Sequence, residues 1–116
     1  PNSFHYLREN IKLNKINNIT PLLGDCMDIT PKYSADRIIM GYVKTTHHYL
    51  KVAIDSLNKG GVIHYHETVP EKLMDTRPIN RIKEVAGDRS VEFLKLNKVK
   101  KYSPGVFHVV CDARIN

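Results

Sequence analysis

The run Gly24-Asp25-Cys26 combines residue types that could bind a nucleotide base. It follows a short apolar stretch at residues 19–23, which we expect to form a buried strand. Open α/β sheets bind ligands beyond the carboxyl ends of their strands. At such an end the Asp25 carboxylate can accept a hydrogen bond from an adenine amine, while the Cys26 N–H reaches a ring nitrogen. An aspartate that only caps a turn or a helix has the same spacing, and on spacing alone that role is favoured.

A second candidate, Met40-Gly41-Tyr42-Val43, lies at the end of the next apolar run. Residues 35–43 include three consecutive apolar side chains, which predicts a second buried strand. Gly41 would let a ligand approach the backbone closely, and Tyr42 could stack on a base or donate a hydrogen bond. A strand-end glycine beside a packed tyrosine explains the same pattern, so both interpretations remain open.

The third candidate is His64-Tyr65-His66-Glu67. Because side chains alternate along a strand, His64 and His66 share one face, and Tyr65 and Glu67 share the other. Two histidines at this spacing can open a metal site, but a catalytic zinc needs a third protein ligand, and no nearby residue has the spacing to supply it. We therefore expect no metal, and we assign His64 and His66 a structural or substrate-facing role. No Ser or Cys lies in a GxSxG-like elbow, which disfavours a hydrolase.

Basic residues gather at residues 95–102, where lysines accompany Tyr102. The whole chain carries 18 Lys and Arg against 12 Asp and Glu, a formal net charge of +6. Such a balance favours an anionic partner, because Lys and Arg gain by displacing counterions from phosphates. We take Lys98, Lys100 and Lys101 as candidates for contacting RNA. Lysines that protect a solvated edge strand would give the same pattern, so that interpretation stays open as well.

Helix and strand patterns alternate along the chain and must position these runs. The first expected helix covers residues 4–11, and a second is capped by Thr45 or Thr46 and ended by Gly60-Gly61. Two more helices are expected near residues 70–75 and at residues 78–86. The expected strands are residues 19–23, 35–43, 62–69, 91–99 and 106–113, and the last two form a hairpin.

This order predicts an α/β fold with a mostly parallel sheet, closed by an antiparallel hairpin. At 116 residues, the chain is long enough for one small domain. A Rossmann-like sheet that ends this way has earlier strands and a glycine-rich turn. This chain has no GxGxxG and begins at Pro1, so we expect a piece that starts after those elements. Two distant cysteines and no membrane-length apolar run predict a reduced, cytoplasmic protein.

Taken together, these runs resemble the tRNA guanine-N1 methyltransferase superfamily. Residues 1–14 resemble the stretch that follows its NP dipeptide, and residues 36–43 (DRIIMGYV) resemble its next motif. Residues 60–69 (GGVIHYHETV) and 100–110 follow at the expected places. The resemblance covers essentially the whole chain and keeps the motif order.

The superfamily has two main archaeal branches. The guanine-N1 methyltransferases carry Asn-Leu-Pro where this chain has Gly41-Tyr42-Val43. The chain is more similar to the wybutosine-pathway aminocarboxypropyltransferases, whose motifs resemble GYV followed by IHYHE. The resemblance implies transfer of the 3-amino-3-carboxypropyl group of S-adenosylmethionine to a tricyclic guanosine 3′ of the anticodon in tRNA(Phe). Guanine-N1 methyl transfer is the alternative enzyme activity, and a noncatalytic basic α/β module that binds RNA is the alternative of another class.

The resemblance also implies residue roles. Asp25 and Cys26 match the family's adenine-binding pair, and Met40 and Gly41 would complete the cofactor side. Four further residues would face the substrate: Tyr42, Val43, His64 and His66. Residues 1–116 would form the C-terminal portion of one catalytic domain of the Rossmann-like class I methyltransferase fold, without its first glycine-rich turn and without an N-terminal domain. S-adenosylmethionine would be the co-substrate, no metal would take part, and a monomer is favoured.

Overall fold

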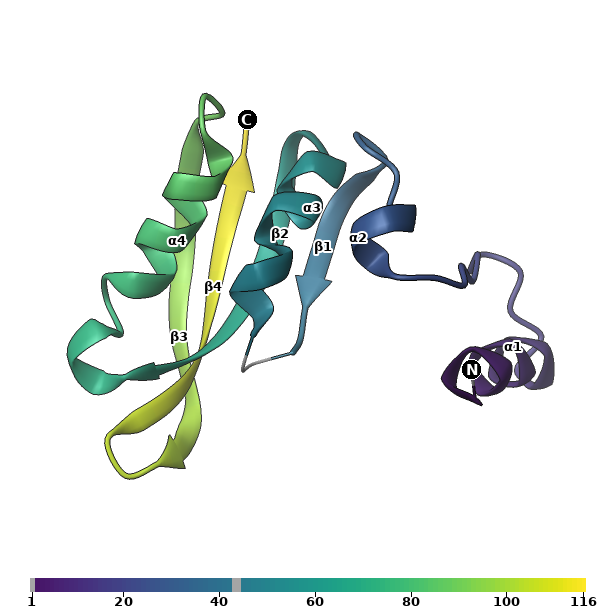
Figure 1. Ribbon diagram of the computed structural model, residues 1–116, viewed down its shortest axis with the longest axis horizontal. Coiled ribbons are helices and arrows are strands. Elements are labelled where there is room, and N and C mark those ends of the chain that lie inside the picture. The colour runs from purple at the N-terminus through teal and green to yellow at the C-terminus, as the bar shows by residue number, and fades with distance from the viewer. Residues whose placement is uncertain (1, 43–44) are drawn as a thin grey trace. The chain divides into compact units, whose positions relative to one another are not determined.

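A computed structural model describes residues 2–42 and 45–116, so Val43 of the second candidate run lies outside the described residues. The chain divides into two units, residues 1–30 and residues 31–116. The first unit contains helix α1 (Asn2–Leu13) and the short helix α2 (Cys26–Ile29) (Figure 1). Phe4, Leu7 and Ile11 recur at helical spacing and predicted α1, which the structure confirms.

The strand expected at residues 19–23 is absent, and this prediction was wrong. These residues have no regular structure and pair with no strand among the described residues. Leu22 and Leu23 are more than half exposed. A strand exists only through hydrogen bonds to a neighbour, and Pro21 cannot donate one. Apolar composition alone therefore does not make this stretch a strand.

The second unit is built on a four-stranded sheet in the order β1-β2-β4-β3. Its strands are β1 (Ala35–Met40), β2 (Leu57–Pro70), β3 (Val91–Ser103) and β4 (Val106–Ile115). β1 pairs with β2 in parallel, with Ile38 opposite Ile63, whereas β4 is antiparallel to both β2 and β3. The closing hairpin is confirmed, but the described sheet is mixed rather than mostly parallel. The reason is that β4 lies between β2 and β3 and runs opposite to both. The strands β1, β2 and β3 therefore run in the same direction, but only β1 and β2 form a parallel pair among the described strands.

Two helices cover one face of this sheet, α3 (Leu50–Ser56) and α4 (Arg77–Ala86) (Figure 1). Short 3-10 turns precede them, η1 (Thr46–Tyr49) and η2 (Glu71–Leu73). The amphipathic pattern of residues 78–86 correctly predicted that α4 buries Ile82, with Ile79 and Val85 packed against the core. The core between helices and sheet is made mainly of Leu50, Ile54, Leu57, Ile63, Tyr65, Ile82, Cys111, Ala113 and Ile115.

Gly60 and Gly61 do not end a helix, as the sequence pattern had suggested. α3 ends at Ser56, and β2 begins at Leu57 with a shift of register against β1. Gly60 has φ +84° within this bulge, a conformation that favours glycine. A Cβ at Gly61 would lie 2.8 Å from a Leu57 methyl carbon and 3.2 Å from the Asp36 carbonyl oxygen. The two glycines therefore allow the bulge and the close approach of β1 rather than a helix cap.

The two cysteines have opposite environments, which gives a testable difference. Cys26 is exposed, whereas Cys111 is 1% exposed within the core, and burial raises its pKa to about 12. Because only the thiolate reacts, we expect Cys111 at pH 8 to alkylate on the order of a thousand-fold more slowly than an ordinary cysteine. Timed alkylation of the native full-length protein, followed by peptide mass spectrometry, measures this rate. Rapid labelling of the Cys111 peptide in the native protein would contradict the packing described here.

Candidate functional site

Asp25 is the N-cap of α2. Its Oδ1 accepts a hydrogen bond from the Met27 N–H at 2.9 Å, and its backbone carbonyl accepts from Asp28 and Ile29. The simpler sequence interpretation, an aspartate that caps a helix, is therefore met. Asp25 and Cys26 are exposed, and within the described residues no hydrogen bond uses Oδ2 of Asp25. That oxygen is available to an adenine amine, so capping and base binding are compatible.

Gly24 fixes the backbone in front of this pair. Its φ of +143° is one that residues with side chains rarely adopt, and an added Cβ would lie 2.7 Å from Cγ2 of Ile29. Glycine is therefore required for the chain to turn into α2.

Gly41 follows directly after the end of β1 in the second unit. Met40 is 8% exposed and belongs to the core, whereas Tyr42 is 60% exposed. A Cβ added at Gly41 would meet no atom of the described residues within 4 Å. Open space thus lies beside the backbone at the carboxyl end of β1, the position at which open α/β sheets bind ligands.

His64 and His66 lie on the face of β2 opposite to Tyr65 and Glu67, as the alternating pattern predicted. The ring nitrogens of His64 are 2.7 Å from Asp112 Oδ1 and 2.6 Å from Arg37 Nη1. The Nδ1 atom of His66 is 2.9 Å from Nε2 of His108. Burial, and then the charge of His108, lowers the pKa of His66. Both histidines thus have partners across the sheet.

A metal site is not assembled from these groups: no set of three His, Cys, Asp or Glu side chains in the described ranges is placed to hold an ion. Within the same ranges, no helix has both the length and the apolar character needed to cross a membrane.

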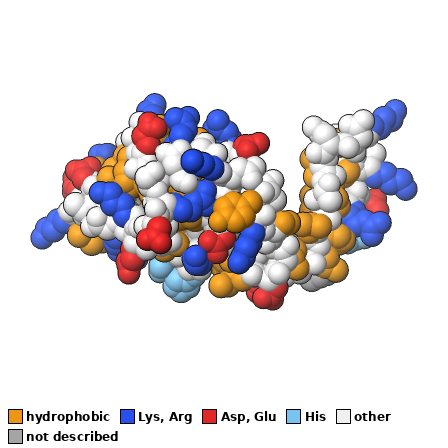
Figure 2. Space-filling model, turned by 90° about the horizontal axis from the view of Figure 1, so that it is seen from above, with side chains coloured by type: hydrophobic (Ala, Val, Ile, Leu, Met, Phe, Trp, Pro, Cys, Tyr) orange, Lys and Arg blue, Asp and Glu red, His pale blue; other side chains and the backbone are white. Residues whose placement is uncertain are grey.

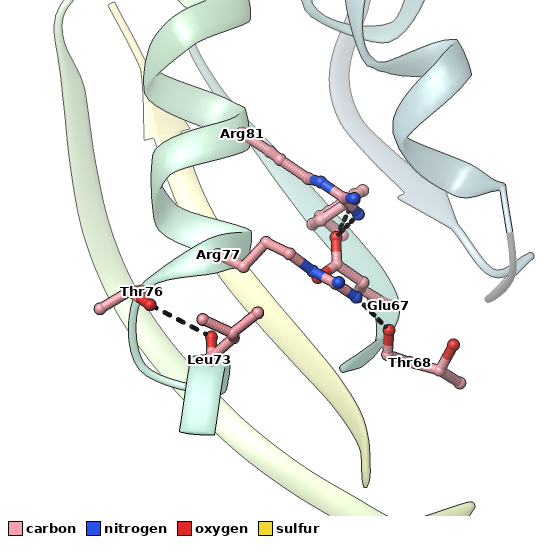
Figure 3. A network of polar contacts seen from close by, with 7 residues as sticks. Glu67, Thr68, Leu73, Thr76, Arg77 and Arg81 are labelled. Carbon is pink, nitrogen blue, oxygen red and sulfur yellow. Dashed lines mark hydrogen bonds and ion pairs between the residues drawn. The ribbon is translucent and has the colours of Figure 1, made fainter. Parts of the chain in front are cut away.

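The structure reveals a buried polar cluster that the sequence interpretation missed. Glu67 is 2% exposed, and its Oε1 accepts hydrogen bonds of 2.5 Å from the Tyr65 hydroxyl and from Arg81 Nη1. Its Oε2 accepts from Arg77 Nε at 2.9 Å, and Arg77 also donates to the Thr68 carbonyl oxygen at 2.7 Å (Figure 3). Burial and the bond to Glu67 raise the pKa of Tyr65, so its hydroxyl remains a donor. The available signal was the spacing of four between Arg77 and Arg81, which puts both on one helix face.

The basic residues of β3 lie along an edge of the described sheet, and Lys98, Lys100 and Lys101 are all exposed. The Lys98 Nζ atom is 4.3 Å from the centre of the Phe107 ring, a cation–π contact. Register shifts interrupt the β3–β4 pairing near these lysines, as is common for edge strands. Lys and Arg side chains are also spread among acidic ones over the face seen in Figure 2.

The chain matches one protein-family model, described as the TRM5/TYW2 methyltransferase domain, over residues 1–94. It is 52% identical to the tRNA(Phe) (4-demethylwyosine(37)-C(7)) aminocarboxypropyltransferase of Methanocaldococcus jannaschii, covering 98% of this chain and 47% of that protein. It is 42% identical to the tRNA (guanine(37)-N(1))-methyltransferase Trm5b of Pyrococcus abyssi, covering 100% of this chain and 35% of that protein. The chain thus spans about half or less of the length of these relatives.

Solved structures give the same grouping. The structure of M. jannaschii TYW2 in complex with AdoMet has a TM-score of 0.91 and 51% identity, with 100% of this chain and 54% of that chain covered. The structure of P. horikoshii TYW2 in complex with MeSAdo has a TM-score of 0.91 and 42% identity, with 99% of this chain and 45% of that chain covered.

Proposed function

The chain belongs to the TRM5/TYW2 methyltransferase family, and on that premise we propose that it is part of an aminocarboxypropyltransferase that uses S-adenosylmethionine and modifies tRNA. The observation that carries this proposal is the 52% identity to the M. jannaschii aminocarboxypropyltransferase over nearly the whole chain. The substrate we propose is a tricyclic guanosine derivative next to the anticodon of tRNA(Phe), as the name of that relative indicates.

For the cofactor side we propose Asp25 and Cys26 of the first unit and Met40 and Gly41 of the second. The unused Asp25 oxygen and the open space at Gly41 are compatible with these roles. Tyr42, Val43, His64 and His66 are the residues we propose toward the substrate. For His64 and His66 we favour an indirect contribution, since both are bonded across the sheet. We propose further that residues 1–116 form the C-terminal portion of a Rossmann-like catalytic domain, and that its glycine-rich turn and an N-terminal domain are not included in them.

The reaction requires positioning more than a new catalytic group. A sulfonium has three carbons open to displacement, and the one that reacts is the one held at attack distance from the nucleophile. We propose that a ring carbon of the base attacks the methionine Cγ. The C–S bond breaks with its electron pair remaining on sulfur, methylthioadenosine leaves, and the ring carbon loses its proton. The open space beside Gly41 would leave room for the methionine arm to turn toward the base.

The partner proposed for the basic edge of the sheet is the tRNA backbone, with Lys98, Lys100 and Lys101 as contacts. Their exposure supports this proposal. We also propose a cytoplasmic location and a monomer. Methyl transfer to guanine N1 remains the second candidate activity, because the P. abyssi Trm5b shares 42% identity with the chain.

The two candidate activities are distinguished by an isotope label placed at either of two positions in S-adenosylmethionine. Full-length protein is incubated with tRNA and S-adenosylmethionine labelled either in the methionine carboxyl group or in the methyl group. We expect only the carboxyl label to enter tRNA. Entry of the methyl label alone would identify a methyltransferase instead.

Asp25→Ala should weaken S-adenosylmethionine binding by about 1–3 kcal/mol, because the amine of the bound adenine would be left without its hydrogen-bond acceptor. Calorimetry on the full-length variant measures this change. Asp28→Ala is the matched control, since Asp28 is an exposed residue of the same short helix. If Asp25→Ala binds the cofactor as tightly as the control, Asp25 is only a helix cap.

A further inference from the structure

Two arginines share one buried carboxylate at the carboxyl-terminal part of β2. Arg77 and Arg81 both donate to Glu67, and Figure 3 shows their side chains reaching from α4 toward the same group. Tyr65 adds a neutral donor to that carboxylate. The two arginines and one glutamate therefore give the cluster a net charge of +1, and the glutamate is the buried member.

The arginines keep donors for a further partner. Arg77 uses Nε toward Glu67 and Nη2 toward Thr68, which leaves Nη1. Arg81 donates to Glu67 through Nη1 and also interacts with the Tyr65 hydroxyl, so at least one of its other nitrogens has no hydrogen-bond partner in the described part of the chain. Their side chains are 26% and 30% exposed, whereas that of Glu67 is 2% exposed. The guanidinium groups thus separate the buried carboxylate from solvent and remain accessible themselves.

The turn η1 contributes a second observation at the same end of the sheet. Within the described ranges, the buried atoms Thr46 Oγ1 and His47 Nδ1 have no hydrogen-bond partner. Burial, and then the charge of Arg81, lowers the pKa of His47, so the ring lies within electrostatic reach of the arginines. Buried polar atoms without partners are uncommon in folded proteins, and a bound group or its water shell would satisfy them.

A purely structural ion pair does not require this arrangement. One arginine with the Tyr65 hydroxyl would already provide Glu67 with a charged partner, and a second buried charge adds a desolvation penalty. Arg89, in the same unit, shows how an arginine with a structural role differs. Its guanidinium donates to backbone carbonyl oxygens, those of Ile54, Leu57 and Asn58. Arg81 has no such backbone bond among the described residues.

We propose that Arg77 and Arg81 form a phosphate-binding site for the backbone of the RNA substrate. This inference rests on the proposed function. The planar fork of a guanidinium matches two phosphate oxygens, and Glu67 holds both forks in place so that little side-chain entropy is lost on binding. The two arginine side chains are partly exposed, so the backbone of a polyanion can reach them. The net charge of +6 on the chain also favours binding of a polyanion. The site lies close to the carboxyl end of β1, because Tyr65, two residues before Glu67, pairs with Met40.

Arg81→Gln in the full-length protein tests the site, because Arg77 then still neutralises Glu67 and the fold is preserved. We expect tRNA affinity to fall about 10-fold at moderate salt, and the slope of log K against log salt to decrease by about 1. S-adenosylmethionine affinity should not change. Arg81→Lys keeps the charge without the fork and should restore the salt slope but only part of the affinity. Arg114→Gln is the matched control, since Arg114 pairs with Glu92 on the exposed surface.

Two results would overturn this inference. Unchanged tRNA affinity and salt slope in Arg81→Gln would leave the cluster a structural ion pair. A loss of affinity for S-adenosylmethionine but not for methylthioadenosine, with an unchanged tRNA slope, would assign the arginines to the donor's carboxylate. Failure of the wild-type protein to bind tRNA or transfer the group would instead count against the proposed function.

Discussion

Gly41→Asn is expected to reduce aminocarboxypropyl transfer by at least about 100-fold while leaving S-adenosylmethionine affinity close to that of the wild type. A misplacement of about 1 Å at a reacting centre costs on the order of 100-fold in rate. Gly41 directly follows the core residue Met40, and an added Cβ meets nothing within 4 Å among the described residues. The structure therefore accommodates the first side-chain atom of an asparagine, and its amide would extend into the space proposed for the base and the methionine arm.

Cofactor affinity and product formation are measured on the same Gly41→Asn preparation. Gly41→Ala is the control, because it adds only the Cβ that the structure accommodates, and it should retain most of the activity. Turnover of Gly41→Asn near the wild-type rate would show that this strand end does not shape the reaction. The preference for aminocarboxypropyl over methyl transfer would then lose its physical basis at Gly41.

Glu67→Gln is expected to lower the free energy of unfolding by about 3 kcal/mol. Removal of one partner from a buried ion pair costs about 3–5 kcal/mol, because the remaining charge is left uncompensated. We expect the lower end of this energy range, because Arg77 and Arg81 are partly exposed and can turn toward water. The glutamine keeps the shape of the side chain, so the loss reports the charge and not a cavity.

Urea unfolding of the full-length variants measures this difference. Glu92→Gln serves as the control, because Glu92 and Arg114 form an exposed pair, and such pairs contribute at most about 1 kcal/mol. If Glu67→Gln unfolds at the same urea concentration as Glu92→Gln, the buried cluster does not fasten α4 to the sheet.

The second unit was largely predictable because its elements carry regular patterns. Alternation along residues 62–69 put Tyr65 and Glu67 on the face opposite to His64 and His66, and Ile79, Ile82 and Val85 marked the inner face of α4. The turn at Pro104-Gly105 predicted the β3–β4 hairpin. These signals are local, so one sequence is enough to read them.

Features that depend on pairing between distant segments were not predictable. Residues 19–23 have a strand-like composition but no neighbour among the described residues to complete a ladder. Gly60 has the positive φ expected of a helix cap, yet the pairing of β1 with β2 places it in a bulge. The position of β4 between β2 and β3 is likewise a property of the whole sheet.

In the candidate site, too, local features were predictable from the sequence and contacts between distant segments were not. Residue types identified Asp25 and Gly41 as strand-end or turn positions, but only the structure shows that Asp25 caps α2 with a single oxygen. The partners of His64 and the sharing of Glu67 by two arginines arise from segments far apart in sequence. Alternation put Glu67 on the same face as Tyr65, but it did not show that this face is buried or which arginines contact the carboxylate.

Mass spectrometry of the modified nucleoside tests the central claim most directly. Full-length protein is incubated with S-adenosylmethionine and tRNA that carries the tricyclic guanosine, and both the nucleoside and the spent donor are identified. An aminocarboxypropyl adduct together with released methylthioadenosine is the result we predict. A methyl adduct together with S-adenosylhomocysteine would contradict it.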